Sequence, residues 1–289
     1  MSQPSVNAEL RRMLTINSIG WGTCGAVFAQ DQACTVVKLA KNDPMELWND
    51  YIKHKKIAKQ FKRFRIEEVR IPGRYFFIPS DLTEWFERSP GLTEAAKDVC
   101  NLPTCALLTQ RIHTLPRPIR HLLIEKYCQP SIKHQALAAP GNNDCLLRLH
   151  LNWMLELKLD VDAMARRMGV ALAIMHWVAK TDANDVEFML GCSTTKVPLE
   201  DDEMDADTIK TLIYTGPSSC ITEDFFGHKT ELWVLDFDKV RPITLVDDAG
   251  VAQAAEAFRD ESGHYVELPG KFISEVTEAE RRRLAERKG

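Results

Sequence analysis

Three glycines and a lysine near the N-terminus have the types and spacing of a phosphate-binding element. Gly20, Gly22 and Gly25 fit the pattern G-x-G-x-x-G, and Lys38 follows in a second apolar segment. The backbone of such a loop can fold over phosphate groups, and a lysine on the next strand can neutralise their charge. Turn formers follow Ala29 where a dinucleotide-binding unit would need a helix. We therefore expect a β-hairpin, with Lys38 on the strand after it.

Carboxylates in the second half of the chain could move a proton or hold a cation. Asp182 and Glu187 are five positions apart after an apolar helical pattern, and Asp236 ends an apolar run. In phosphoryl transfer one aspartate positions a hydroxyl group, while further oxygen ligands hold Mg²⁺. Neighbouring acids raise each other's pKa unless a divalent ion, an arginine-like ligand or a lysine lies among them.

These patterns give two sets of site residues in addition to the glycines. Catalytic roles are predicted for Lys38, Asp182 and Glu187, and Glu187 with Asp236 would be the metal ligands of a Mg²⁺-dependent enzyme. The predicted substrate-binding residues are Gly20, Gly22, Gly25, Asp50, Asp185, Asp236 and Asp238.

A helix must follow the Lys38 strand and carry the acid that pairs with this lysine. Asp43 can cap a helix that begins at Pro44 and runs to about Phe61, and Asp50 is the better-placed partner for Lys38. The apolar residues predicted to form its buried side are Trp48, Tyr51, Ile52, Ala58 and Phe61.

Periodicity divides the rest of the chain into a strand-rich part and a helical part. Strands are predicted at 69–79, 106–112 and 119–128, the last entering a hinge between two lobes, and a break follows at 138–143. Apolar spacings of three and four predict helices over 146–178. Further predictions are helices at 5–14, 251–258 and 277–288, a strand at 232–237 and a polar loop at 193–224. The expected fold is α+β, with an N-terminal lobe at 1–128 and a C-terminal lobe at 129–289.

Composition excludes several classes of protein. With 289 residues and 45% hydrophobic content, the chain can form a sizeable core, and it has no apolar run long enough to cross a membrane. The N-terminus lacks a signal-peptide pattern. The eight cysteines are scattered without zinc-ligand spacing. We expect a cytoplasmic protein with reduced cysteines and no membrane partner.

The chain resembles a fungal protein-kinase-like domain of unknown function, found in hypothetical proteins that are sometimes misnamed zinc-finger proteins. This resemblance covers about residues 15–265 and implies a two-lobe, aminoglycoside-phosphotransferase-like fold. Two departures stand out: Lys180-Thr181 replace the His or Arg before the catalytic Asp, and Glu187 replaces a metal-ligand Asn. The motifs that carry the resemblance are residues 20–25, 47–51, 175–177, 182–188 and 235–238.

Some members of this group resemble arginine-containing cyclodipeptide synthases of secondary metabolism. The resemblance implies acyl transfer from aminoacyl-tRNA, without a cofactor, to form a cyclo-Arg-Xaa diketopiperazine. Asp182 or Glu187 would deprotonate the attacking amine, and Asp236 with Asp238 would hold the arginine side chain. The nucleophile for any covalent intermediate stays open among Ser18, Thr23 and Cys24.

A basic segment fits an RNA partner. Between residues 51 and 74 nine basic and two acidic residues give a charge of +7, whereas the whole chain carries −4. Such a face can bind an RNA backbone, although a solvated helix face gives the same pattern. The predicted tRNA contacts, with no DNA partner expected, are Lys53, Lys55, Lys56, Lys59, Lys62, Arg63 and Arg65.

Two other functions fit the same residues. In an ATP-dependent small-molecule phosphotransferase, Lys38 would bind phosphates, Asp182 would position a hydroxyl group, and Glu187 with Asp236 would hold Mg²⁺. A pseudokinase-like scaffold would instead bind a partner through its cleft and its charged tail. Stabilisation by Mg-ATP would favour the first function, and salt-sensitive binding of tRNA would favour the synthase.

Overall fold

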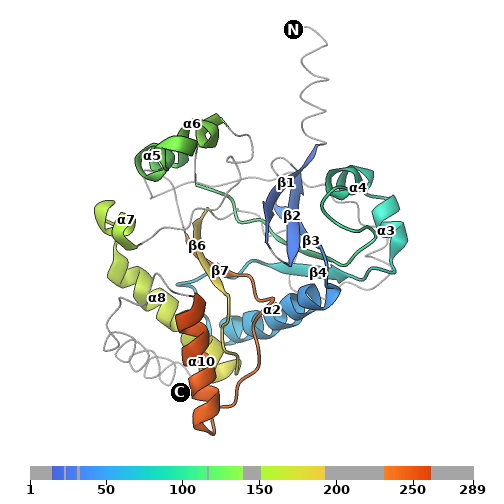
Figure 1. Ribbon diagram of the computed structural model, residues 1–289. Helices are drawn as coiled ribbons and strands as arrows, with labels where there is room; N and C mark the ends of the chain where they lie inside the picture. The colour runs from blue at the N-terminus through green and yellow to red at the C-terminus, as the bar shows by residue number, and fades with distance from the viewer. Residues whose placement is uncertain are drawn as a thin grey trace. The chain divides into compact units, whose positions relative to one another are not determined.

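A computed structural model describes residues 15–22, 24–30, 33–115, 117–138, 151–192 and 231–261 (Figure 1). Thr23, the predicted helices at 5–14 and 277–288, and the whole of the predicted loop at 193–224 lie outside these ranges. Contacts group the chain into two compact units that alternate along the sequence. The sheet unit comprises 1–48, 72–146 and 191–230, and the helical unit comprises 49–71, 147–190 and 231–289. The predicted lobe boundary at 128 and 129 stays a prediction.

The sheet unit is built on a five-stranded antiparallel sheet with the order β1-β2-β3-β5-β4. The first three strands form two consecutive hairpins. Their Val, Ile and Phe residues favour extended backbone. Their bounds are β1 (Ile16–Trp21), β2 (Gly25–Gln30), β3 (Thr35–Ala40), β4 (Arg74–Ile78) and β5 (Ala106–Gln110). The β-hairpin predicted from the glycines is confirmed, and so is the strand that carries Lys38.

Two short helices complete the core of the sheet unit. Helices α3 (Thr83–Glu87) and α4 (Pro90–Ala96) contribute Trp85 and Leu92, both fully buried, to a cluster with the sheet residues Phe28 and Leu39. Burial of these large side chains supplies the main stabilising free energy of this unit. Outside this cluster, α5 (Arg117–Tyr127) packs against α6 (Pro130–Ala138).

The strand predicted at 119–128 is wrong, because this segment forms helix α5. The run Leu122-Leu123-Ile124 is apolar enough for a strand, but burial follows a helical period. Arg120 and Leu123 are buried, whereas Leu122 is 45% exposed. The hinge strand expected at this point is therefore absent.

Helix α2 (Pro44–Phe64) connects the two units and confirms the predicted helix. Asp43 caps it by accepting a hydrogen bond from the Met45 N–H at 2.8 Å. It ends where Arg65 adopts a left-handed conformation with φ 52°, and the Ile66 N–H bonds back to the Phe61 carbonyl.

The predicted buried side of α2 is wrong in part. Trp48 is 41% and Ile52 is 38% exposed, although Phe61 is buried as expected. The buried positions recur at spacings of three and four and include two polar residues, Asp50 and His54. Apolar character alone could not locate this face, because polar side chains with specific partners take two of its positions. The full buried row is Leu47, Asp50, His54, Ile57, Phe61 and Phe64.

The helical unit surrounds a second core. Its elements are the part of α2 from Asn49, α7 (Leu151–Glu156), α8 (Val161–Ala173), the π-helix η2 (Ile174–Val178), β6 (Glu187–Gly191), β7 (Glu231–Leu235) and α10 (Asp248–Glu261). The core joins Ile57 and Phe61 of α2 with Ile174, Val234 and Phe237. Strands β6 and β7 form a separate two-stranded sheet. The chain is thus a mixed α and β protein, with the predicted helices at 161–178 and 251–258 confirmed.

Candidate functional site

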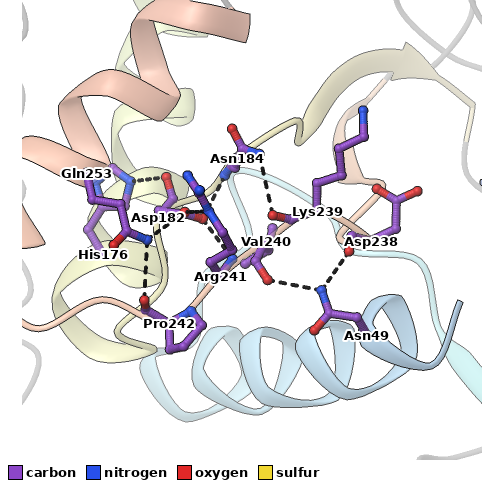
Figure 2. A network of polar contacts seen from close by, with 10 residues as sticks. All are labelled: Asn49, His176, Asp182, Asn184, Asp238, Lys239, Val240, Arg241, Pro242 and Gln253. Atoms are coloured by element: carbon purple, nitrogen blue, oxygen red, sulfur yellow. Dashed lines mark hydrogen bonds and ion pairs between the residues drawn. The ribbon is translucent and has the colours of Figure 1, made fainter. Parts of the chain in front are cut away.

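The two predicted acidic segments meet in the helical unit, although they are more than fifty residues apart in the chain. Thr181 and Pro242 form an antiparallel backbone bridge. On either side of it, the Asp182 N–H donates to the Arg241 carbonyl at 3.0 Å, and the Ile243 N–H donates to the Lys180 carbonyl at 3.1 Å. The segments 180–187 and 236–243 therefore form one joined loop pair, part of which is drawn in Figure 2.

Asp182 lies at the centre of this loop pair, and both of its carboxylate oxygens accept hydrogen bonds (Figure 2). Its Oδ1 accepts from the backbone N–H groups of Arg241 at 2.8 Å and Asn184 at 3.1 Å. Its Oδ2 accepts from Arg241 Nε at 2.8 Å and Gln253 Nε2 at 2.9 Å. A carboxylate offers about four lone-pair sites, so these four donors saturate it.

Burial and hydrogen bonding act in opposite directions on Asp182. Burial raises the pKa of its carboxyl group, but the hydrogen bonds from Arg241, Gln253 and Asn184 together outweigh burial and lower the pKa below its usual value. The side chain has no exposed surface, with a relative accessibility of 0%. Asp182 is therefore a weak base at neutral pH, and it is better suited to hold the loops together than to accept a proton.

Helix α10 presents Gln253 to this carboxylate. Asp247 caps the helix, because its Oδ1 accepts from the Gly250 N–H at 3.0 Å and from Thr244 Oγ1 at 2.9 Å. A Cβ atom at Gly250 would lie 1.6 Å from the Thr244 carbonyl oxygen. Only glycine allows this close approach, and it brings the first turn of α10 against the loop.

Four non-glycine residues of the site have left-handed backbone conformations. The φ angles are 54° at Lys180, 56° at Ala183, 58° at Asp185 and 64° at Asp236. Each costs of the order of 1 kcal/mol or more, and such strain gathers at functional sites, where surrounding contacts maintain it. The hydrogen bonds of Asp182 supply those contacts here.

The second acidic segment is anchored to helix α2. Asn49 Nδ2 donates to the carbonyl oxygens of Asp238 at 2.6 Å and Val240 at 3.1 Å (Figure 2). The residue before Asp238 also contacts this helix, because the Phe237 N–H donates to Asp50 Oδ1 at 3.4 Å. Lys239 pairs with Asp185 at 2.5 Å and so adds a second link between the loops.

The π-helix η2 positions a histidine next to segment 180–187. Thr181 donates to the Met175 carbonyl through both its N–H, at 2.9 Å, and its Oγ1, at 3.0 Å. His176 Nε2 lies 3.3 Å from the Asp182 carbonyl oxygen. Burial lowers the pKa of His176, although Asp182 partly opposes this. The ring is thus neutral at pH 7 with its proton on Nε2, because a carbonyl oxygen can only accept a hydrogen bond.

The glycine hairpin belongs to the sheet unit and is built locally. The Gly22 N–H donates to the Gly25 carbonyl at 2.9 Å, and Lys41 Nζ donates to the Gly22 carbonyl at 3.0 Å. A Cβ atom at Gly25 would lie 2.8 Å from the Leu39 carbonyl and 3.1 Å from Lys38 Cγ, whereas the space around Gly20 and Gly22 is open. Gly25 is therefore required by packing against the Lys38 strand.

Two of the three candidate nucleophiles, Ser18 and Cys24, lie within the described ranges, and both are poorly placed. Cys24 is 3% exposed, which supports a packing role. Ser18 lies on β1, and its Oγ is buried. The six cysteines within the described ranges form no disulfide bond.

The basic residues of α2, with Arg65 just after its end, fall into two groups. Lys56, Lys59, Lys62, Arg63 and Arg65 are exposed, whereas Lys53 and Lys55 are partly buried. The pKa of Lys53 is lowered by burial and then by Lys56, while Asp182 acts in the opposite direction. The exposed cations lie on the helix side opposite the buried row, as a solvated or RNA-binding face requires.

The predicted site residues are thus distributed over both units. The acids Asp50, Asp182, Asp185, Asp236 and Asp238, and also Glu187, belong to the helical unit, and the glycines and Lys38 belong to the sheet unit. The predicted pairing of Lys38 with Asp50 would join the two units and stays a prediction. In the part of the chain that the structure describes, no group of three or more His, Cys, Asp or Glu residues could hold a metal ion. No helix there is long and apolar enough to span a membrane.

Sequence reasoning did not find four residues that build the site: Asn49, Lys239, Arg241 and Gln253. Asn49 lies within the motif at 47–51, and the two cations lie within the second acidic segment, just after Asp238. These neighbours were a usable signal. For Gln253, 71 positions from its partner Asp182, the sequence offers none.

Comparison with known proteins gives one partial match. A family model described as "Zinc finger protein" matches residues 232–280, which begin in β7 and include the second acidic segment and Gln253. The matched residues contain no cysteine and one histidine, His264. Structural zinc sites use about four Cys or His ligands, so the matched segment cannot supply the site that this description suggests. A search of curated proteins finds no match.

Proposed function

We propose that this chain is an aminoacyl-tRNA-dependent synthase of arginine-containing cyclic dipeptides, with a protein-kinase-like fold. The observation that carries the proposal is the joined loop pair, which gathers the acids of both segments on a strained and tightly bonded backbone. The hydrogen bonds of Asp182 maintain its conformation. Such preorganised acids suit a cationic substrate.

The charges of the loop pair support a guanidinium ligand. Segment 180–187 carries three acids and one lysine, and segment 236–241 carries two acids and two basic residues, so the pair has a formal charge of −2. Asp182 and Asp185 are ion-paired with Arg241 and Lys239. Carboxylates bind guanidinium groups through paired charge-assisted hydrogen bonds. We assign Asp236 and Asp238 to the arginine side chain.

The reaction needs two successive acyl transfers. The α-amine of one aminoacyl group loses a proton and attacks the ester carbon of the other, and the ribose oxygen of that tRNA leaves and takes up a proton. The new dipeptidyl ester is then attacked by its own terminal amine, which closes the ring and releases the second tRNA. Because the Asp182 oxygens are occupied and its pKa is lowered, we assign the role of base to the other candidate, Glu187 at the start of β6.

An RNA substrate explains the exposed cations of α2. Lys56, Lys59, Lys62 and Arg63 stand on one solvent face of a continuous helix, where they could contact successive phosphates. Phosphate contacts make binding strongly salt-dependent. Reversing Lys55, Lys56 and Lys59 to Glu should abolish salt-sensitive tRNA binding while leaving the far-ultraviolet circular dichroism unchanged.

Mass spectrometry of cells that express the chain tests the proposed reaction directly. We expect a new cyclic dipeptide that contains arginine, and we expect Glu187→Gln to lose it while Glu84→Gln, the same change at an exposed glutamate of α3, retains it. Purified protein with charged tRNA should form the same product without ATP. Product formation that required Mg-ATP and no tRNA would overturn the proposal.

An ATP- and Mg²⁺-dependent phosphotransferase is the second candidate, and the glycine hairpin favours it. The packing of Gly25 against the Lys38 strand keeps the hairpin backbone close to this lysine, as a phosphate-binding loop requires. The saturation of Asp182 argues against the role of positioning a hydroxyl group. A rise in melting temperature with Mg-ATP that Lys38→Met removes would favour this candidate.

A further inference from the structure

Two cations of α2, Lys53 and Lys56, lie on the flank of the helix that carries Asn49. Asn49, Lys53 and Lys56 are spaced by four and three residues, so they lie on the same flank of the helix. Asn49 donates to the Asp238 and Val240 carbonyl groups at 2.6 and 3.1 Å, which shows that this flank faces the second acidic segment. Lys53 is thus one turn along the helix from a residue in contact with the loop pair.

The acid that acts on the pKa of Lys53 is already paired with another cation. Asp182 is close enough to act on Lys53 electrostatically, but its carboxylate is already paired with Arg241 at 2.8 Å. Lys56 acts on Lys53 with a like charge. Partial burial of one ammonium group beside a second one is unfavourable, and a bound anion would remove this cost.

We propose that Lys53 and Lys56 together bind one phosphate group, at the end of the α2 basic face that adjoins the acidic loop pair. The inference rests on the proposed function for its source, which is a phosphate near the aminoacylated end of tRNA. An acidic loop repels RNA, so a phosphate can come this close only where cations offset the negative charge. Lys59, Lys62 and Arg63, further along the exposed face, bind phosphates at a distance from the loop.

The test compares ligands of different length on four proteins. Binding of whole tRNA, of a short single-stranded RNA that ends in CCA and of Mg-ATP is measured by titration with the wild type and with Lys53→Met, Lys56→Met and Lys62→Met. Methionine keeps the aliphatic stem and removes the charge. Lys62→Met is the matched control, because it removes a cation of the same helix that lies away from the flank of Asn49.

We expect Lys53→Met and Lys56→Met each to weaken binding of the short RNA about tenfold, the loss of one charge-assisted contact. Lys62→Met should change binding of the short RNA less than about twofold. It should weaken binding of whole tRNA and lower by about one the number of phosphate contacts inferred from the salt dependence. Melting temperatures of all variants check that they remain folded.

Each other result also has a meaning for the phosphate site. Loss of Mg-ATP binding in Lys53→Met, with RNA binding unchanged, would support the site and identify a nucleotide as its source. Loss of short-RNA binding in a protein that makes no cyclic dipeptide would support the site and refute the synthase. Equal effects of Lys53→Met and Lys62→Met on all three ligands, or none, would overturn the inference.

Discussion

The glycine hairpin and the Asp182 loop pair achieve order in opposite ways. The hairpin joins strands that are consecutive in the chain, and its contacts are backbone hydrogen bonds such as the one from Gly22 to Gly25. The loop pair brings together α2, segments 180–187 and 236–243, and α10 around one buried charge. Because its contacts are local, the hairpin can be recognised in the sequence, and it should tolerate a side chain where the space is open, as at Gly20 and Gly22. Dependence on one carboxylate makes the loop pair specific and vulnerable.

The largest expected effect comes from neutralising the centre of the loop pair. Asp182→Asn replaces one acceptor oxygen with an amide that faces Arg241 Nε and Gln253 Nε2, so donors would meet a donor. We expect a loss of about 3 kcal/mol or more in the free energy of unfolding, measured with urea.

Asp185→Asn is the matched control for this change. Asp185 also has an ion pair, but it is partly exposed, and asparagine tolerates its left-handed backbone. Its loss should stay below about 1 kcal/mol. Equal losses in the two variants would show that burial of Asp182 does not govern the stability of the loops.

Alanine at three glycines compares the two regions on one scale. Gly250→Ala places a Cβ atom 1.6 Å from the Thr244 carbonyl oxygen, and Gly25→Ala places one 2.8 Å from the Leu39 carbonyl oxygen. Both backbones must shift, so we expect a loss of about 3 kcal/mol or more at Gly250 and about 1–2 kcal/mol at Gly25. Gly20, with open space around it, is the control and should change by less than about 0.5 kcal/mol.

The informative result is the order of the three variants by their loss of stability. Thermal unfolding followed by circular dichroism would give it directly. A Gly20→Ala variant as unstable as Gly25→Ala would contradict the packing argument for the hairpin.

The smallest expected effect is the pH dependence of the wild type. The folded pKa of Asp182 lies below its unfolded value of about 4, so its contribution is complete above pH 4 and is lost as the pH falls through the folded pKa. The folded pKa of His176 is also lowered, so the unfolded chain binds more protons below about pH 6.5 and stability falls there too.

Variants separate the two titrations. Urea midpoints measured between pH 7.5 and pH 3 should fall in two stages for the wild type. His176→Gln should flatten the stage that begins below about pH 6.5, and Asp182→Asn should flatten the one that begins below about pH 4. A wild-type curve that rises as the pH falls from 6.5 to 5 would refute the assignment of a buried neutral His176.

Local patterns in the sequence were sufficient for the hairpin, the Lys38 strand and the helix that begins at Pro44. Each depends on residues a few positions apart, whose conformational preferences and capping act within one turn or strand. The same local reasoning failed for residues 119–128, where a short apolar run fits both strand and helix, and for Trp48 and Ile52, which it placed in the core.

Tertiary structure alone decided what the acids do. Asp182 accepts from Arg241, 59 positions away, and from Gln253, 71 positions away. A carboxylate in water would be a plausible base, whereas the same group, buried and saturated by four donors, becomes a structural anion with a lowered pKa. Charge and residue type are properties of the sequence, but burial and hydrogen-bond partners set proton affinity, and they exist only once distant segments have packed together.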